Sequence, residues 1–316
     1  MPTVAIIIPT YNRSRFLADV IENVKRAASD AEIILVDDGS TDDTLRVCES
    51  LAGIRYIRLP CNQGLAAARN AGIRSTSAEF VAFVDDDDLR LRGSIDLQIG
   101  VLQTTPNAAV CYGRMLLADS KNRLPTGQIF PLTCPSGDIF WDLLEGLFPV
   151  SIVARRQALL ESGLFNPELR RSEDWDLWLR MAQTHRFVAV SEPVAVYRQA
   201  NLNSGQICSD AVLMCRQMLS VQQAALKLPR ALRAPSRRRR QAHRRLLKLA
   251  YDDLRYEAQR ALENGDRHMA RSIASEALRL RPIRARGDLS LRRLLRVTRS
   301  RRIVQHPDSQ GAPIPW

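Results

Sequence analysis

The chain has 316 residues, 45% of them hydrophobic, and a formal net charge of +12. This length suits one large globular domain or two ordinary ones. No apolar run approaches the ~20 residues of a membrane-spanning helix, and the N-terminal residues lack the basic segment that begins a signal peptide. The six cysteines are scattered and form no Cys-x-x-Cys pair, which is typical of reduced thiols. We therefore expect a cytoplasmic protein.

The positive charge is concentrated toward the C-terminus. Residues 226–302 contain 24 Lys and Arg against 7 Asp and Glu, whereas the rest of the chain contains 22 against 27. A mildly acidic body therefore carries a strongly basic tail. This asymmetry indicates two functional parts.

The N-terminal part of the chain alternates between apolar strands and amphipathic helices. Such repetition with short loops predicts a doubly wound α/β fold with a mostly parallel sheet flanked by helices. Pro9 is expected to end the first strand because proline has no N–H for sheet pairing. The predicted strands are Val4 to Ile8, Ala31 to Val36, Ile54 to Leu59 and Phe80 to Val84, and helices are predicted to begin near Ser14, Asp43 and Leu65.

Four consecutive aspartates, Asp85 to Asp88, directly follow the fourth predicted strand. The carboxyl end of a strand is where an open α/β sheet binds its ligands. Four adjacent like charges repel each other, and a bound Mg²⁺ or Mn²⁺, which takes oxygen ligands, would remove that repulsion. The alternative is a solvated acidic turn.

After residue 209 the pattern becomes helical and basic. Helices are predicted over Ala211 to Leu228, His243 to Asn264 and Arg267 to Leu280, and a last basic segment runs from Leu289 to Val304. Three interpretations of this tail stay open. The tail forms either a solvated helical cap on the body or a surface that lies on an anionic membrane. The third interpretation is a nucleic-acid-binding segment, and the scarcity of aromatic residues disfavours it.

Six motifs between Pro2 and Ser204 carry a family resemblance. They are Ile6-Ile-Ile-Pro-Thr-Tyr-Asn-Arg13, Asp37-Asp-Gly-Ser-Thr-Asp42, Asn62-Gln-Gly-Leu-Ala-Ala-Ala-Arg-Asn70, Phe83-Val-Asp-Asp-Asp-Asp88, Gly163-Leu-Phe-Asn-Pro-Glu168 and Ser172-Glu-Asp-Trp-Asp-Leu-Trp-Leu-Arg180. In this order and spacing they resemble the family 2 glycosyltransferases. These are nucleotide-sugar-dependent enzymes with the GT-A fold.

The resemblance implies a donor-binding role for the motifs of the first half. Asp38 would accept the ring N–H of the nucleotide base, or else cap a helix. Tyr11 would line the same pocket, or else pack on the rim of the sheet, and Arg69 would contact a phosphate or an acidic neighbour, or else form a surface salt bridge. The residues expected to bind the nucleotide sugar are Thr10, Tyr11, Arg13, Asp38, Gly64, Arg69, Asp85 and Asp86.

The resemblance also implies a metal site and a catalytic base. Asp87, together with Asp85, would hold Mn²⁺ or Mg²⁺ at the donor diphosphate, and Asp174 would take the proton from the acceptor hydroxyl. The alternative for the Glu173–Asp174 pair is stabilisation of a helix N-terminus, and Trp175 would either pack inward or stack on an acceptor sugar. One feature departs from the family pattern, because Tyr197-Arg198 is not followed by the histidine that completes the metal site in many members.

These expectations define one hypothesis and two alternatives. The hypothesis is an inverting, metal-dependent transferase that moves a sugar to a saccharide or lipid-linked glycan acceptor, and the expected donor is a UDP-sugar. Such an enzyme would act in polysaccharide or cell-envelope glycan synthesis, at the inner face of a membrane. A nucleotidyltransferase and a non-catalytic basic adaptor are the alternatives. The expected organisation is a catalytic domain over residues 1–205 (nucleotide half 1–105, acceptor half 106–205), a basic helical region over 206–305 and a disordered tail over 306–316.

Overall fold

We describe a computed structural model of the chain over residues 2–118, 125–198 and 211–280. The chain forms two compact units, Met1–Leu249 and Ala250–Trp316. The predicted change of domain near residue 205 stays a prediction. The predicted basic segment 289–304, the predicted tail 306–316 and residues 199–210 lie outside the described residues.

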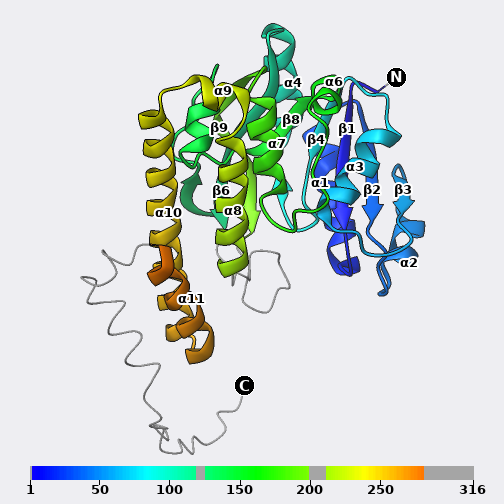
Figure 1. Cartoon of the computed structure of the whole chain (residues 1–316). Coiled ribbons are helices and arrows are strands. Elements are labelled where there is room, and N and C mark those ends of the chain that lie inside the picture. Colours follow the sequence, from blue (N-terminus) through cyan, green and yellow to red (C-terminus); the bar gives the residue numbers. More distant parts are fainter. Residues whose placement is uncertain (1, 119–124, 199–210, 281–316) are drawn as a thin grey trace, which may run out of the picture. The chain divides into compact units, whose positions relative to one another are not determined.

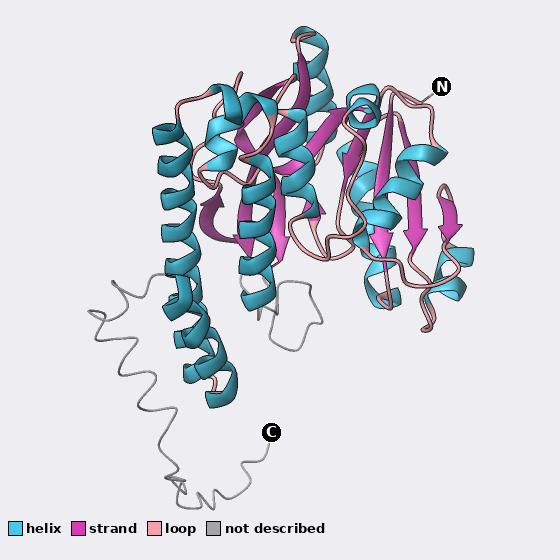
Figure 2. Ribbon diagram, in the orientation of Figure 1, coloured by secondary structure: helices cyan, strands magenta, loops and turns pink. Residues whose placement is uncertain are grey.

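One mixed sheet forms the centre of the first unit (Figures 1 and 2). Its strand order is β3-β2-β1-β4-β8-β6-β9-β5, with β7 paired to β6. Strands β1, β2, β3 and β4 are parallel to one another, and β6 and β9 run in the same direction, because β8 is antiparallel to both β4 and β6. The strands are β1 (Val4–Thr10), β2 (Ala31–Asp37), β3 (Arg55–Arg58), β4 (Phe80–Phe83), β5 (Leu89–Arg90), β6 (Ala108–Ala118), β7 (Pro125–Phe130), β8 (Val150–Arg155) and β9 (Arg186–Arg198).

Helices cover both faces of the parallel half of this sheet. Alternate β1 residues Val4, Ile6 and Ile8 share one core with α1 and α4. On the other face α3 lies so close to β1 that a Cβ on Gly72 would be 2.6 Å from the Ile7 side chain. The helices of the first unit are α1 (Ser14–Ala27), α2 (Thr44–Ser50), α3 (Leu65–Ser75), α4 (Ser94–Thr104), α5 (Phe140–Leu144), α6 (Arg156–Glu161), α7 (Glu173–Met181), α8 (Ala211–Ala225) and α9 (Pro229–Arg233).

This architecture confirms the predicted α/β class with a mostly parallel sheet. All seven β1 residues are buried, as expected for a strand covered on both faces. The sequence left residues 106–136 and 182–198 without assigned strands. There β6 and β9 form a long parallel pair with several register shifts, which no regular alternation in the sequence marks.

The prediction that Pro9 ends the first strand was wrong. Pro9 is paired with Val36 of β2, and β1 continues to Thr10. The Ile7 carbonyl accepts from Val84, on the β4 side, and the Thr10 carbonyl accepts from Asp38, on the β2 side. Backbone groups alternate in direction along a strand, so the Pro9 nitrogen faces the β4 side, beyond the last β4 pair. Its missing N–H therefore removes no ladder bond.

The basic segment begins its long helix earlier than predicted. Helix α10 runs from Ser236 to Glu263, so it includes the four arginines 237–240, whereas His243 was the expected start. Pro235 immediately precedes it, and proline and arginine are both compatible with a helix start.

Side chains of α8, α9 and the first part of α10 bind the body of the first unit. Gln222 is fully buried and donates to the Leu144 carbonyl at 2.7 Å. Glu145 forms ion pairs with Arg238, at 2.5 Å, and with Arg245. The Arg238 guanidinium lies 4.9 Å from the centre of the Trp141 ring. These contacts join residues 211–249 to the sheet unit through buried polar groups as well as apolar packing.

The second unit contains the later part of α10 and the predicted helix α11 (Arg267–Leu280). The later part of α10 buries Leu254, Ala258 and Ala261, and α11 buries Ala270, Ile273, Ala274 and Ala277. Among the described residues, no helix has the length and apolar character needed to cross a bilayer.

Candidate active site

Three loops meet at the carboxyl edge of the parallel strands. The strand order places β1 between β2 and β4, so the segments after Thr10, Asp37 and Phe83 are neighbours (Figure 1). This is the edge at which open α/β sheets bind ligands. The fold therefore brings together the motifs that the sequence analysis singled out in separate places.

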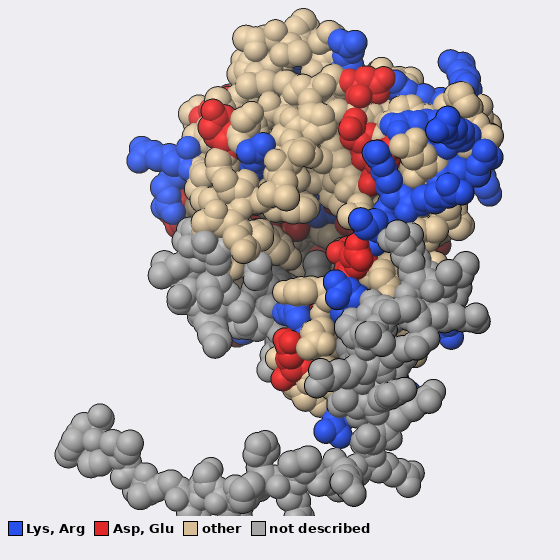
Figure 3. Space-filling view, turned by 90° about the vertical axis from the view of Figure 1, so that its left-hand side faces the viewer, with Lys and Arg blue, Asp and Glu red and all other residues tan. Residues whose placement is uncertain are grey.

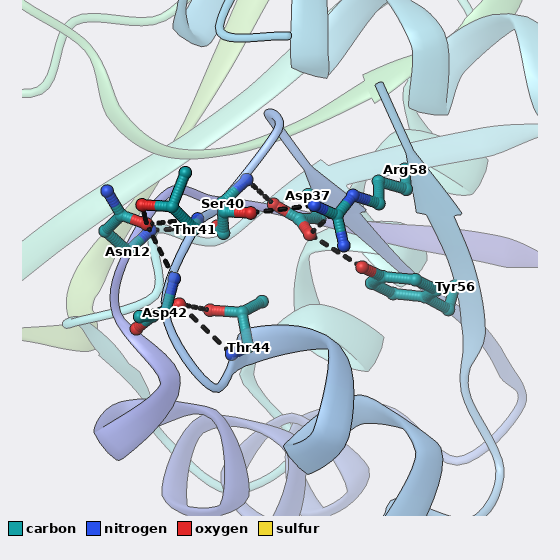
Figure 4. A network of polar contacts seen from close by, with 8 residues as sticks. All are labelled: Asn12, Asp37, Ser40, Thr41, Asp42, Thr44, Tyr56 and Arg58. Carbon is teal, nitrogen blue, oxygen red and sulfur yellow. Dashed lines mark hydrogen bonds and ion pairs between the residues drawn. The ribbon is translucent and has the colours of Figure 1, made fainter. Parts of the chain in front are cut away.

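A buried carboxylate shapes the loop after β2 (Figure 4). Asp37 is fully buried and accepts hydrogen bonds from the Ser40 backbone N–H at 2.7 Å and from the Tyr56 hydroxyl at 2.6 Å. From the neighbouring loop, the Asn12 side chain accepts from the Thr41 backbone N–H at 2.7 Å. The loops after β1 and β2 are thus held to each other by side chain to backbone bonds.

Gly39 allows this loop to turn against its neighbour. Its φ is +76°, and a Cβ there would lie 2.6 Å from the Cys61 carbonyl carbon. We expect Gly39→Ala to lower the free energy of unfolding by roughly 3 kcal/mol, because it combines a left-handed backbone with a backbone clash.

Gly53→Ala is a matched control for this prediction. Gly53 has the same φ of +76°, but its nearest neighbour would be 4.0 Å away. It should lose only the roughly 1 kcal/mol of the backbone conformation. Equal losses for the two variants in urea denaturation would show that the close approach at Gly39 contributes nothing.

Asp38 fastens the loop before α3. Its two carboxylate oxygens accept from the backbone N–H groups of Gln63 at 2.7 Å and Gly64 at 2.8 Å. Burial raises the pKa of Asp38, although both N–H groups and Arg170 act in the opposite direction. Asp38 therefore spans two loops instead of capping its own helix.

The first three aspartates of the acidic run differ sharply in environment. Asp86 is buried and accepts from the Thr10 hydroxyl at 2.7 Å, and burial raises its pKa to about 7 despite the nearby Arg13 guanidinium. Asp87 forms a 2.6 Å ion pair with Arg13. Asp85, whose side chain is 45% exposed, pairs instead with Arg69 at 2.8 Å.

Arg69 joins this run to the start of α7. Its guanidinium is buried, and its second nitrogen binds the Glu173 carboxylate at 2.8 Å. The alternative of a weak surface salt bridge is therefore wrong, and of the expected contacts the acidic neighbours are the ones observed. Burial and the neighbouring Asp174 raise the pKa of Glu173 to about 7, while Arg69 opposes the shift. Arg69 thus binds a residue that is 104 positions away in the chain.

Asp174 lies beside this bridge at the first turn of α7. Its carboxylate accepts from the Trp175 backbone N–H at 2.7 Å, and burial raises its pKa against the opposing effect of Arg69. Trp175 itself is 1% exposed, packs against Phe148 and donates its ring N–H to the Leu147 carbonyl. The alternative of Trp175 stacking on an acceptor sugar is therefore wrong, because its ring is in the core.

The structure brings most of the predicted site residues into two adjoining groups. The first contains Thr10, Arg13, Arg69, Asp85, Asp86, Asp87 and Asp174, and the second contains Asp38 and Gly64. Tyr11 is 42% exposed. Its side chain is therefore accessible at the carboxyl edge of the sheet.

Sequence reasoning missed Arg170. This exposed arginine precedes α7, and its guanidinium is 3.6 Å from the position that a Cβ on Gly64 would occupy. No hydrogen bond or ion pair engages its guanidinium within the described residues. The sequence places Arg170 two residues before the Ser172-Glu173 motif, and this proximity is the feature that could have identified it.

The carboxylates suit a hard divalent cation as part of a larger ligand set. Asp85 and Asp87 offer oxygen donors, the type that Mg²⁺ and Mn²⁺ prefer. Within the described part of the chain, no group of three or more His, Cys, Asp or Glu side chains is arranged to hold a metal alone. The remaining ligands would come from a bound diphosphate and water, which is a common arrangement for Mg²⁺.

Comparisons with known proteins agree on one family. The family described as "Glycosyl transferase family 2" matches residues 5–163. An uncharacterized glycosyltransferase of Rickettsia felis is 28% identical over 62% of this chain and 33% of its own length. A Campylobacter jejuni protein, named GalNAc(5)-diNAcBac-PP-undecaprenol beta-1,3-glucosyltransferase, is 29% identical over 63% of this chain and 65% of its own length. The chain thus spans about a third of the length of the first curated relatives it matches.

Two solved structures share the fold. Staphylococcus aureus TarS 1-349 in complex with UDP-GlcNAc has a TM-score of 0.62 at 15% identity, covering 94% of this chain and 90% of that one. The mannosyltransferase PcManGT from Pyrobaculum calidifontis, in complex with GDP-Man and Mn²⁺, has a TM-score of 0.58 at 16% identity, covering 94% and 84%. At such identities the likeness concerns the GT-A-type fold.

Proposed function

The chain belongs to glycosyl transferase family 2, and on that premise we propose that it transfers a sugar from a nucleoside-diphosphate sugar to a hydroxyl group of a glycan. The observation that carries the proposal is the Arg69 bridge between Asp85 and Glu173. It holds Asp85, on the proposed donor side, near the first turn of α7 that contains Glu173 and Asp174, so that donor and base can be presented at one reaction centre.

We assign the donor nucleotide to the edge formed by the first two loops. A base placed there would meet the Asp38 carboxylate as acceptor and the exposed Tyr11 ring as a flat surface. Uracil has the ring N–H that such an acceptor would bind, and the solved neighbour TarS holds UDP-GlcNAc. UDP is therefore the proposed nucleotide, with Thr10, Arg13, Asp85 and Asp86 on the side of the ribose and diphosphate.

Arg170 adds a cation that the diphosphate can use. Its guanidinium lies near Gly64 and Asp38 and is exposed. Arginine binds phosphate oxygens through two parallel hydrogen bonds. In a chain without a histidine directly after Tyr197-Arg198, this residue would supply part of the positive charge that the diphosphate needs.

We propose Asp174 as the general base. An acceptor hydroxyl is a poor nucleophile, and a carboxylate within hydrogen-bond reach raises its reactivity by accepting its proton. The raised pKa of Asp174 makes the carboxylate a stronger base than a solvated aspartate. With the base and the diphosphate on opposite sides of the sugar, a single displacement would invert the anomeric centre.

Asp87 and Asp85 are the proposed residues for Mn²⁺ or Mg²⁺. When bound, such a cation acts as a Lewis acid that offsets the charge of the departing nucleoside diphosphate. The solved neighbour PcManGT contains Mn²⁺. In the structure, Arg13 pairs with Asp87 and Arg69 pairs with Asp85, and these arginines offset the carboxylate charges.

A lipid-linked glycan is the proposed acceptor class. The name of the Campylobacter jejuni relative specifies an undecaprenol diphosphate carrier, and that relative aligns with 63% of this chain. A reaction on such a carrier takes place at a membrane surface, and we propose a peripheral enzyme of cell-envelope or polysaccharide glycan synthesis.

Calorimetric titration with UDP tests the donor assignment. We expect UDP to bind more tightly with Mn²⁺ than without it, and Asp87→Asn to remove most of that gain because it removes one proposed ligand. Asp43→Asn is the control, since Asp43 is a surface carboxylate whose ion-pair partner is Arg46. Failure of UDP, GDP and dTDP to bind, with and without metal, would contradict the proposed function.

A further inference from the structure

Four basic residues of α10 lie along one face of the helix. They are Arg237, Arg240, Arg244 and Lys248, and their spacing of three, four and four residues places them in one stripe. All four are exposed. Within the described residues none of them forms an ion pair, and Arg240 donates only to the Ser236 hydroxyl. In Figure 3, which shows the side on which α9 and α10 lie in Figure 1, Lys and Arg side chains gather into one extended group.

The opposite face of the same helix segment holds it to the body. Ala242 and Leu246 are fully buried there, and Arg238 and Arg245 both pair with Glu145. Arg238 and Arg245 of this segment therefore have a structural partner, whereas the outer stripe presents its charge to solvent.

The composition of the segment favours a lipid surface over a nucleic acid. Residues 230–249 contain nine Lys and Arg, no Asp or Glu, and no Phe, Tyr or Trp. Single-stranded nucleic acids are bound by aromatic rings that stack on the bases, and none is present. One apolar residue of the same segment, Leu232 of α9, is 56% exposed. A segment with both exposed arginines and an exposed leucine suits the boundary between headgroups and acyl chains.

From these observations we infer that the outer stripe of α10 docks the enzyme onto an anionic phospholipid surface. The inference rests on the proposed function for its purpose, because a lipid-linked acceptor would be met at that surface. Each basic residue near an anionic surface strengthens binding by about fivefold. The four residues together would strengthen membrane binding by about 600-fold, which is enough to concentrate the protein on vesicles.

Vesicle flotation of the full chain tests the inference. We expect binding to vesicles that contain phosphatidylglycerol and little binding to pure phosphatidylcholine. Raising the salt from about 0.1 M to about 0.5 M should release the protein, because the Debye length shortens. The double variant Arg237→Glu/Arg244→Glu should bind at least about 25-fold more weakly.

The control is Arg74→Glu/Arg92→Glu, which changes the net charge equally. Both residues are exposed, lie outside α9 and α10, and form no ion pair within the described residues. Equal losses for the two double variants would overturn the inference, because only net charge would matter. So would equal binding to neutral vesicles, or tighter binding to a DNA duplex than to anionic vesicles. UDP titration of the same preparations separates failure of docking from failure of the donor site.

Discussion

Asp174→Asn is expected to lower kcat by about 10²- to 10⁴-fold while UDP binding is kept, because the amide cannot accept the acceptor proton. The measurement is sugar transfer with the donor that binds, alongside calorimetric titration of UDP. Asp176→Asn is the control, since this carboxylate belongs to the same first turn but is bound to Arg180. A variant with intact transfer would show that Asp174 is not the general base.

The same substitution should not destabilise the fold. Burial raises the pKa of Asp174 above its ordinary value. A carboxyl group with a raised pKa binds its proton more tightly in the folded chain than in the unfolded chain. The free energy of unfolding therefore falls as the pH rises from the pKa of this group in the unfolded chain to its pKa in the folded chain. Asparagine cannot ionise and avoids that loss. We expect Asp174→Asn to unfold at the same or a higher temperature than wild type at pH 8, so lost activity would not reflect unfolding.

Arg69→Met is expected to lower the free energy of unfolding by about 3–5 kcal/mol, because it leaves the buried Glu173 carboxylate without its cation. Transfer should fall as well, since Glu173 and Asp85 would no longer be held at 2.8 Å from one group. Arg69→Lys should recover only part of the loss, because a single ammonium lacks the planar fork of guanidinium. Urea denaturation and transfer rates check both effects.

A double variant identifies the mechanism of the Arg69 effect. If the loss comes from uncompensated charge, adding Glu173→Gln to Arg69→Met should restore part of the stability, giving a coupling between the two sites. Strictly additive losses would instead indicate that Arg69 acts through apolar packing on Phe165, which its guanidinium also contacts. Arg74→Met is the control, because Arg74 lies on the same helix, exposed and without an ion pair in the described residues.

The sequence predicted the parallel half of the sheet well for a physical reason. Strands β1, β2 and β4 are continuous apolar runs that end at polar motifs, so their ends and the loops at the site could be placed in advance. Strand β9 contains Ser191, Glu192 and Pro193, and its register shifts against β6. Such irregular strands are defined by their neighbours and carry no local pattern.

Which residues pair within the site could not be predicted in the same way. The motifs named Arg13, Arg69 and the aspartates, but not that Arg13 would pair with Asp87 and Arg69 with Asp85. The long-range pair of Arg69 with Glu173 depends on how α7 packs against the sheet. Arg170 belongs to no motif with an assigned role, so only its position beside Gly64 makes it a candidate.

The contacts of Glu145 and Gln222 have a consequence for how this chain can change by recombination. An exchange that replaced everything after residue 205 with a foreign segment would separate Glu145 from Arg238 and Arg245, and the Leu144 carbonyl from Gln222. A buried carboxylate and a buried carbonyl would then lack partners, which is strongly destabilising. The catalytic body and the first part of the basic region are therefore expected to be inherited together.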